Sequence, residues 1–155
     1  MKLSTRARYG LRALIDLGMN SETETVSLQS IAARQDISVS YLEQLMALLK
    51  KADLVSSSRG ASGGYRLGRD AQDISVGDVL RVLEGGLDAA ACPGTDKDGG
   101  CEGADLCVAR YVWKRINDSI NDAADSMKLS ELIEESKRVR RLQEKQTISG
   151  GTQNG

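Results

Sequence analysis

Three cysteines have the clearest chemical potential in this sequence, and all of them lie between residues 92 and 107. Thiolates bind soft metals and iron–sulfur clusters, and three of them on a short glycine-rich loop can converge on one inorganic centre. We therefore predict a metal site formed by Cys92, Cys101 and Cys107. The alternative is that they are incidental cysteines of a mobile loop, because three ligands without an evident fourth are a moderate signal.

Other kinds of cysteine site fit this spacing less well. Cys92 and Cys101 are further apart than the cysteines of a zinc knuckle, and the chain has no histidine to complete a three-cysteine, one-histidine site. An odd number of cysteines argues against a disulfide framework. No signal peptide is recognisable at the N-terminus, so we expect the thiols to occupy a reducing cytoplasm.

The composition limits the classes of function that the chain can have. Its 155 residues are 40% hydrophobic and 28% charged, which suits one core with an appended element. No apolar run approaches the roughly 20 residues that a membrane-spanning helix needs. Aromatic residues make up only 3%, which disfavours a base-stacking platform for single-stranded nucleic acid. Without histidine, a nucleophile motif or a convincing acid–base pair, we do not expect an enzyme.

The charges are unevenly distributed along the chain. Residues 1–70 contain 10 lysines and arginines against 7 acidic residues, whereas residues 71–127 contain 5 against 11. This distribution permits a phosphate-facing surface only at the N-terminal end, although such an excess is usually just solvated surface.

The spacing of apolar residues predicts three helices in the N-terminal part. These cover residues 5–20, residues 27–34 and, after a tight turn at residues 35–37, a stretch with Leu42, Leu45, Met46 and Leu49 on one stripe. A short helix, a tight turn and a helix with a polar outer face are typical of a helix-turn-helix, whose second helix enters the major groove of DNA.

Four residues at the start of the third predicted helix are candidates for reading DNA. These are Ser40, Tyr41, Glu43 and Gln44. The alternatives are that the polar stripe faces water and that Ser40 and Glu43 form a capping box.

The segment after the third helix predicts a β-hairpin. Residues 54–58 and 65–67 have strand character and flank a glycine-rich tip over residues 59–64. A wing placed directly after a helix-turn-helix commonly lies along the DNA backbone or minor groove, where Arg59 would be attracted by the negative potential. A phosphate-cradling loop is disfavoured because no Gly-Lys-Ser/Thr sequence follows.

Three further helices are expected on either side of the cysteines. A fourth helix over residues 73–84 is capped by Ser75 and ends at Gly85-Gly86. The long apolar pattern that follows Cys107 has nothing large to cover it, so we expect a symmetric dimer, the alternative being that it packs on its own domain. A short helix over residues 129–137 completes the series.

The predicted fold is mainly α-helical with a small β-hairpin wing, a winged helix-turn-helix followed by a long dimerisation helix. The expected regions are a DNA-binding domain over residues 1–85, a cysteine-rich loop over residues 86–108, a dimerisation helix with the short following helix over residues 104–137, and a disordered tail over residues 143–155.

Several of these segments together resemble a known family. Lys2–Leu11, Ser38–Leu45, Asp53–Val55, Arg59–Tyr65 and the three-cysteine loop are similar to the IscR-like family of winged-helix transcription regulators. The resemblance covers residues 1–135. The family also includes the nitric-oxide sensor NsrR and the cysteine-metabolism repressor CymR.

The resemblance implies a homodimer that binds a palindromic operator in double-stranded DNA. Ser40, Glu43 and Gln44 would contact the major groove and Arg59 the minor groove. In the IscR branch, the thiolates that match the three cysteines hold a [2Fe-2S] cluster, with [4Fe-4S] as the alternative here. Iron–sulfur assembly enzymes or enzymes of cysteine metabolism are further partners that the family implies.

The fourth ligand departs from the family pattern. Arg110 stands where IscR-type proteins place a histidine, and Arg8 stands where NsrR-type proteins can supply a carboxylate. Asp105 is the first candidate to replace them, followed by Glu102, a water molecule or a small thiol. Arginine itself is a poor ligand because it stays protonated.

The resemblance leaves two rival functions open. One is a nitric-oxide-sensing regulator of the NsrR type. The other is a cluster-free regulator or interaction protein of the CymR type, in which the cysteine loop is a thiol switch or docks on a metabolic enzyme.

Overall fold

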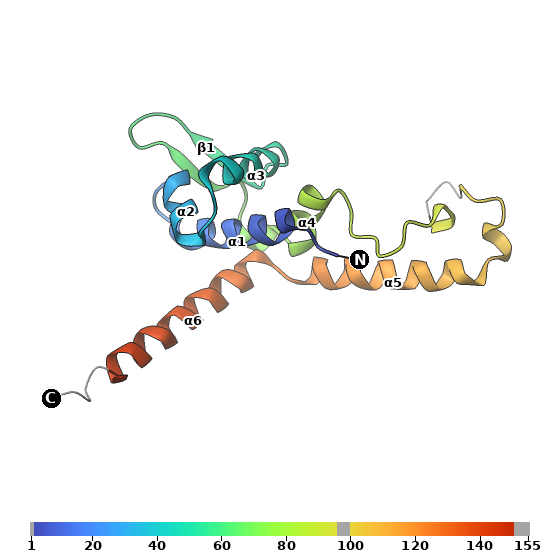
Figure 1. Ribbon diagram of the computed structural model, residues 1–155. Helices are drawn as coiled ribbons and strands as arrows, with labels where there is room; N and C mark the ends of the chain where they lie inside the picture. Colours follow the sequence, from blue (N-terminus) through green and yellow to red (C-terminus); the bar gives the residue numbers. More distant parts are fainter. Residues whose placement is uncertain (1, 96–99, 151–155) are drawn as a thin grey trace.

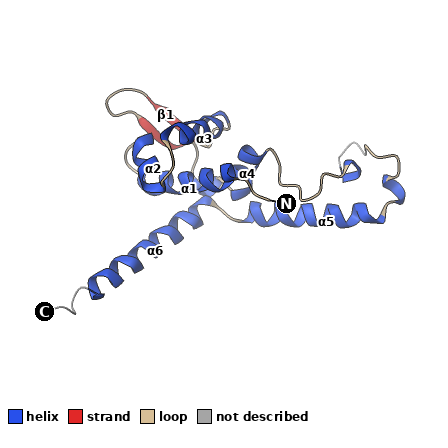
Figure 2. Ribbon diagram, in the orientation of Figure 1, coloured by secondary structure: helices blue, strands red, loops and turns tan. Residues whose placement is uncertain are grey.

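The computed structural model describes residues 2–95 and 100–150, which form six α-helices, three short 3-10 helices and one two-stranded sheet (Figure 1). In chain order the elements are α1 (Thr5–Asn20), α2 (Leu28–Gln35), α3 (Val39–Lys51), β1 (Val55–Ser58), β2 (Gly64–Leu67), η1 (Ala71–Asp73), α4 (Val76–Glu84), η2 (Pro93–Thr95), η3 (Ala104–Leu106), α5 (Val108–Ser126) and α6 (Leu129–Gly150). Figure 2 shows that the hairpin is the one strand-containing part of the described chain. None of the described helices is long and apolar enough to span a membrane. The fold class is therefore the predicted one.

Helix α1 lies at the centre of the N-terminal part and packs against α2, α3, α4 and α6. Two glycines within α1 permit the closest of these contacts. A Cβ atom at Gly10 would overlap the side chain of Leu83 in α4, and one at Gly18 would overlap Ile133 in α6. Glycine costs helix stability, so its presence here is explained by these two close helix contacts.

Serine residues cap the first four α-helices, since each hydroxyl accepts a hydrogen bond from an otherwise unpaired amide of the first turn. The caps are Ser4, Ser27, Ser38 and Ser75, and the last of these forms a capping box with Asp78. Helix α3 thus begins at Val39, and the alternative capping box between Ser40 and Glu43 is not formed.

The turn between α2 and α3 and the hairpin both have the local geometry of a winged helix-turn-helix. Asp36 ends α2 in the left-handed region, at φ 52°, and the Ile37 amide donates to the Ala32 carbonyl at 3.0 Å. The hairpin pairs antiparallel from Val55–Leu67 to Ser58–Gly64. Val26 and Tyr65 exchange two 2.8 Å backbone hydrogen bonds, which attach the hairpin to the chain before α2.

Helices α5 and α6 extend away from the N-terminal part in different directions, and the chain after α4 runs outward alongside α5 before α5 leads back (Figure 1). A second small core anchors the base of α5. Its members are Ala7, Val76, Leu80, Leu87 and Ala124.

Helix α6 is longer than the short helix that we expected over residues 129–137. It has 22 residues and includes residues 143–150, for which the sequence composition predicted disorder. The stretch contains no proline, and helix-forming glutamate, lysine, arginine and glutamine predominate before Thr147. Ion pairs three residues apart, such as Arg138 with Glu135 at 2.5 Å, support the helix further. The remainder of the expected tail, residues 151–155, lies outside the described residues.

Candidate nucleic-acid interface and cysteine loop

The outer face of α3 presents three of the four residues that the sequence singled out there. Ser40, Glu43 and Gln44 are exposed. The opposite stripe of the helix, Leu42, Leu45, Met46 and Leu49, is buried in the main core. Burial of that stripe fixes the rotation of α3, so these three polar side chains point outwards.

Tyr41 is placed differently from its three neighbours. Its ring is half-buried and packs edge-on against Tyr9 of α1, with ring centroids 6.2 Å apart. The guanidinium of Arg12 lies 5.2 Å from the centroid of the Tyr9 ring, which is cation–π distance. These contacts give Tyr41 a structural task, which is to hold the start of α3 against α1.

The wing presents Arg59 at its exposed tip, and side chains connect the wing to the helices. The Lys50 ammonium of α3 donates to the Ser57 hydroxyl of β1 at 2.6 Å. The Thr25 hydroxyl donates to the Ser62 carbonyl in the tip at 2.7 Å. Gly60 has a φ of 106°, a conformation that favours glycine. The wing is therefore held to α3 through Lys50 and to the segment before α2 through Thr25.

An ion pair between a buried carboxylate and an exposed arginine connects α1 to α2, and the sequence did not predict it. Asp16 is 1% exposed and accepts hydrogen bonds from Arg34 and from the Gln35 amide group, the latter at 2.9 Å. The Arg34 guanidinium lies 2.6 Å from the Asp16 carboxylate, and the hydrogen bond between them raises the pKa of Arg34. Arg12 donates to the Gln35 carbonyl at 2.8 Å. The available signal in the sequence was Asp16 itself, an acidic residue among the apolar positions of the predicted helix over residues 5–20.

The three cysteines are not brought together into a metal site. Cys92 is half-buried before η2, whereas Cys101 and Cys107 are exposed, and none of the three forms a disulfide. Within residues 2–95 and 100–150, no group of three or more cysteine, aspartate or glutamate side chains is arranged to hold a metal ion. Asp105 and Glu102, the candidate fourth ligands, are exposed. The three thiols fit an iron–sulfur cluster as a donor set, but their arrangement here does not itself form a complete site.

The start of the cysteine loop is connected to α1 through Glu84, the last residue of α4. The amide of Ser4 donates to the Glu84 carboxylate at 2.9 Å, and the Ser4 hydroxyl donates to the same oxygen. The hydroxyl contact is the main reason why the pKa of Glu84 lies below its usual range. Ser4 also lines a cavity of about 420 Å³ together with Gln44 of α3. The residue at which the loop begins is thus hydrogen-bonded to Ser4, which lines the same cavity as Gln44 of the helix that bears the candidate base-reading residues.

Arg81 forms a second connection, between α4 and α5. Its guanidinium makes two 2.8 Å hydrogen bonds to the Asp125 carboxylate and also donates to the Asn121 side-chain oxygen. The hydrogen bonds from Arg81 lower the pKa of Asp125. Gly77 permits this approach, because a Cβ atom there would overlap the Asp125 carboxylate.

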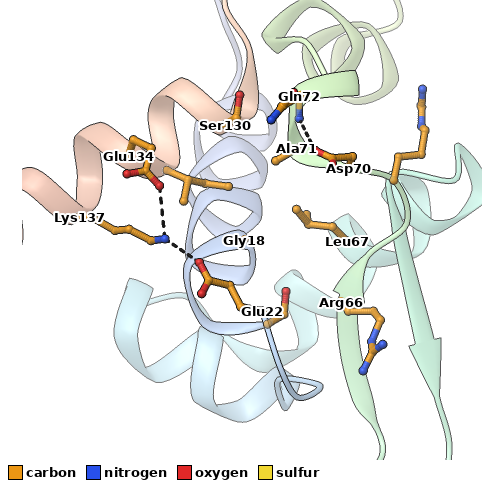
Figure 3. A pocket seen from close by; sticks show the side chains of 13 residues that line it. Gly18, Glu22, Arg66, Leu67, Asp70, Ala71, Gln72, Ser130, Glu134 and Lys137 are labelled. Atoms are coloured by element: carbon orange, nitrogen blue, oxygen red, sulfur yellow. Dashed lines mark hydrogen bonds and ion pairs between the residues drawn. The ribbon is translucent and has the colours of Figure 1, made fainter.

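A cavity of about 500 Å³ lies where α1, β2 and α6 meet (Figure 3). The Lys137 ammonium of α6 lies 2.6 Å from the Glu22 carboxylate and 3.4 Å from that of Glu134. The hydrogen bond to Glu22 is the main cause that raises the pKa of Lys137. This ion pair joins α6 to the end of α1 at the rim of the cavity.

Comparison with known proteins places this architecture in a family. The model of the Rrf2 family, described as iron-dependent transcriptional regulators, matches residues 3–135. The chain is 43% identical over 133 residues to the HTH-type transcriptional regulator IscR of Enterobacter sp. (strain 638), covering 86% of this chain and 80% of the relative. The Escherichia coli (strain K12 / DH10B) IscR is 42% identical over the same share of each chain.

Solved structures agree with this assignment. The structure of CymR, the global cysteine regulator of B. subtilis, superposes with a TM-score of 0.71 at 40% identity, covering 86% of this chain and 97% of that one. T. potens IscR superposes with a TM-score of 0.69 at 41% identity, covering 88% of each chain. The matched relatives are transcriptional regulators, which confirms the expectation that this chain is not an enzyme. The chain belongs to the Rrf2 family of transcriptional regulators.

Proposed function

We propose that this protein is a homodimeric regulator that binds a palindromic operator and responds to an iron–sulfur cluster held by its cysteines. The observation that carries the DNA-binding part is the shared orientation of α3 and the wing, which lie on one side of α1, away from α6 (Figure 1). The hydrogen bond from Lys50 of α3 to Ser57 of β1 connects the helix to the wing. A helix and a wing held in this way can contact neighbouring grooves of one duplex.

The exposed residues of α3 have side chains suited to reading base edges. Gln44 can form two hydrogen bonds to an adenine, and the Glu43 carboxylate can accept from the amino group of a cytosine. Glu43 would also repel phosphate, which makes it a discriminating residue. Ser40 can contact either base edges or the backbone, and Arg59 suits a narrow minor groove.

The dimer is inferred from the exposed apolar face of α5. Val112 and Ile116 are 45% and 41% exposed, and Tyr111 lies beside them. Together with polar neighbours they line a groove of about 410 Å³. A second copy packed on this face would bury it and would place two α3 helices for two half-sites.

Cys92, Cys101 and Cys107 would be the residues that hold the cluster. When bound, a cluster of this kind supplies a centre whose occupancy and charge change with iron supply and oxidation. The protein itself must connect the cysteine loop to α3 and the wing, which would contact DNA. Two described contacts link the elements that flank the loop: Glu84 at the end of α4 is hydrogen-bonded to Ser4, and Arg81 of α4 is paired with Asp125 of α5.

An anaerobic purification tests the cluster, with visible absorption and counts of iron and acid-labile sulfide per chain. We expect a coloured protein with equal iron and sulfide, and loss of both when each cysteine is replaced by alanine. A protein that remains colourless after reconstitution with iron and sulfide would reject the cluster. Selection of duplexes from a random DNA library with the same preparation tests operator binding independently.

The Arg59→Ala substitution tests the wing contact. We expect operator affinity to fall by about 1–3 kcal/mol at fixed salt, because an arginine in the minor groove would be lost. A mobility-shift titration measures this, with Arg69→Ala as the control, because Arg69 is also exposed but lies beyond the wing. Equal affinity of Arg59→Ala and the unmodified protein would contradict the assignment.

A cluster-free regulator that uses its thiols directly is the second candidate. Two observations favour it: among the solved structures, the likeness to B. subtilis CymR is as close as that to T. potens IscR, and the described cysteines do not form a metal site. This candidate predicts operator binding that changes with a thiol oxidant while the protein contains no iron.

A further inference from the structure

Helix α5 has one face that is directed towards the cysteine loop. Arg110, Asn117 and Ala124 follow one another at seven-residue intervals, which places them on the same side of an α-helix, two turns apart. Asn117 and Ala124 are 6% and 5% exposed, and Arg110 is half-buried. Val112 and Ile116 belong to another, exposed face. The first two residues of this loop-facing set carry polar groups that would otherwise prefer water.

Asn117 uses both ends of its side-chain amide to hold the chain just before Cys92. Its Oδ1 accepts from the Ala89 amide at 2.9 Å and from the Ala90 amide at 3.4 Å. Its Nδ2 donates to the Ala90 carbonyl at 3.4 Å. A carboxylate at this position could accept but not donate, and an alanine could do neither. The geometry therefore uses the specific chemistry of asparagine.

Arg110 holds the turn that separates Cys101 from Cys107. Its Nη1 donates to the Ala104 carbonyl at 3.3 Å, an oxygen that also accepts from the Cys107 amide at 3.4 Å. Ala104 is buried, and its own amide donates to the Cys101 carbonyl at 3.0 Å. The Arg110 guanidinium thus holds Ala104, whose backbone is hydrogen-bonded to both Cys101 and Cys107.

Arg110 also lies close to the segment of the first cysteine. A Cβ atom built on Gly94 would lie 3.6 Å from Arg110 Cδ, 3.6 Å from Cys92 Sγ and 3.7 Å from Ala104 Cβ. The aliphatic part of Arg110, the first cysteine and the turn before Cys107 therefore meet around Gly94. The Arg110 side chain therefore lies next to the segments that carry all three cysteines.

We propose that Arg110 and Asn117 are positioning residues, which hold the backbone of the cysteine loop on α5 so that the three thiols remain near its N-terminal end. This inference rests on the proposed function of the cysteines as cluster ligands. Neither side chain would itself be a ligand, since a guanidinium presents hydrogen-bond donors and no acceptor, and the Asn117 amide is engaged by the loop. Holding the loop in place before the metal arrives reduces the conformational entropy lost when the site forms.

Hydrogen exchange of the metal-free protein measures the positioning directly. In Asn117→Ala we expect the amides of Ala89 and Ala90 to exchange at least about tenfold faster, because their shared acceptor is lost. In Arg110→Gln we expect faster exchange at Cys107, whose acceptor carbonyl is no longer fixed. Exchange within α1 to α4 should not change.

Reconstitution with iron and sulfide measures the consequence for the site. We expect both variants to bind less iron and sulfide per chain, and the visible bands to bleach several-fold faster in air. Arg110→Lys, which keeps a cationic donor, should recover part of the loss. Asn117→Asp, which keeps the acceptor alone, should not recover the contact to the Ala90 carbonyl.

Two exposed positions of α5 provide matched controls. Lys114→Gln removes a cation one helical turn from Arg110, and Asp118→Ala removes a polar side chain next to Asn117; within the described residues, these two side chains form an ion pair with each other. Both controls should exchange and bind iron like the unmodified protein. Thermal unfolding by circular dichroism identifies any variant that is not folded, and the Arg110 variants decide the question if those of Asn117 do not fold.

The outcomes separate this inference from the function on which it rests. If the variants match the controls in exchange and in iron content while the unmodified protein binds a cluster, the positioning role is wrong and the proposed function stands. If the unmodified protein binds no cluster, the proposed function fails, and hydrogen exchange alone decides whether Arg110 and Asn117 hold the loop.

Discussion

At the scale of single residues, one carboxylate supports the N-terminus of α1. Glu84 accepts from both the amide and the hydroxyl of Ser4, although the two residues are 80 positions apart. Its pKa is lowered from an ordinary value of 4.5, chiefly by the Ser4 hydroxyl. The ionised form is therefore favoured in the folded chain. Its contribution to stability is complete above the unfolded pKa and is lost as the pH falls through the lower folded value.

Replacement of Glu84 by glutamine should reveal this pH dependence. At neutral pH we expect the free energy of unfolding to fall by about 0.5–1 kcal/mol, a small value because the carboxylate is close to solvent. The difference in the free energy of unfolding between the two proteins should disappear below the folded pKa of Glu84, because the side chain at this position is then uncharged in both proteins. Chemical denaturation at a series of pH values measures it, with Glu24→Gln as the control, because Glu24 is exposed to solvent. A difference that persists in acid would contradict an effect of charge.

At the scale of elements, α1 depends on glycines where other helices cross it closely. Gly10 meets Leu83 of α4, and Gly18 meets Ile133 of α6. The position of α4 is important because the cysteine loop begins at its end, and α4 also packs on α3. A change in the separation of α1 and α4 would therefore move the loop relative to the recognition helix.

The Gly10→Ala substitution should destabilise the protein. Overpacking costs about 1–3 kcal/mol and the better helix propensity of alanine returns about 1 kcal/mol, so we expect a net loss of roughly 1 kcal/mol. Gly103→Ala is the control, because the position is open and has an ordinary negative φ. Thermal unfolding should also show that Leu83→Ala costs less in the Gly10→Ala background than alone. Additive effects would mean that the two side chains do not meet.

At the scale of the whole molecule, the arrangement leaves α5 incompletely covered. One side of the helix holds the loop and α4, while Val112 and Ile116 remain exposed on another. A long helix with one satisfied face and one exposed apolar face suits association with an identical helix.

The Ile116→Glu substitution should therefore give a folded monomer. A carboxylate buried in the proposed dimer interface would be costly to desolvate, whereas in the monomer it remains in water. Sedimentation velocity should show a shift from dimer to monomer, with unchanged helix content by circular dichroism. Lys114→Glu, which puts a carboxylate elsewhere on α5, should remain dimeric. A monomeric unmodified protein would refute the dimer at once.

Local sequence signals predicted most of the elements but few of their contacts. The serine before α4 and the glycine after it marked that helix correctly, and the buried stripe of α3 followed from its spacing. The length of α6 was underestimated because its C-terminal part has little apolar periodicity and depends on helix propensity and on pairs such as Arg138 with Glu135. The DNA contact of Tyr41 stays a prediction, and the packing of its ring on Tyr9 was not predicted.

The sequence by itself determined the helices, the wing and the presence of three thiols on one loop, because each depends on residues close together in the chain. Only the tertiary structure decided which polar residues connect these parts. Asp16 with Arg34, Glu84 with Ser4 and Asn117 with the chain before Cys92 are all partners distant in sequence. Such pairs leave no periodic signal, since each forms only when packing of the apolar faces brings two distant segments to one place.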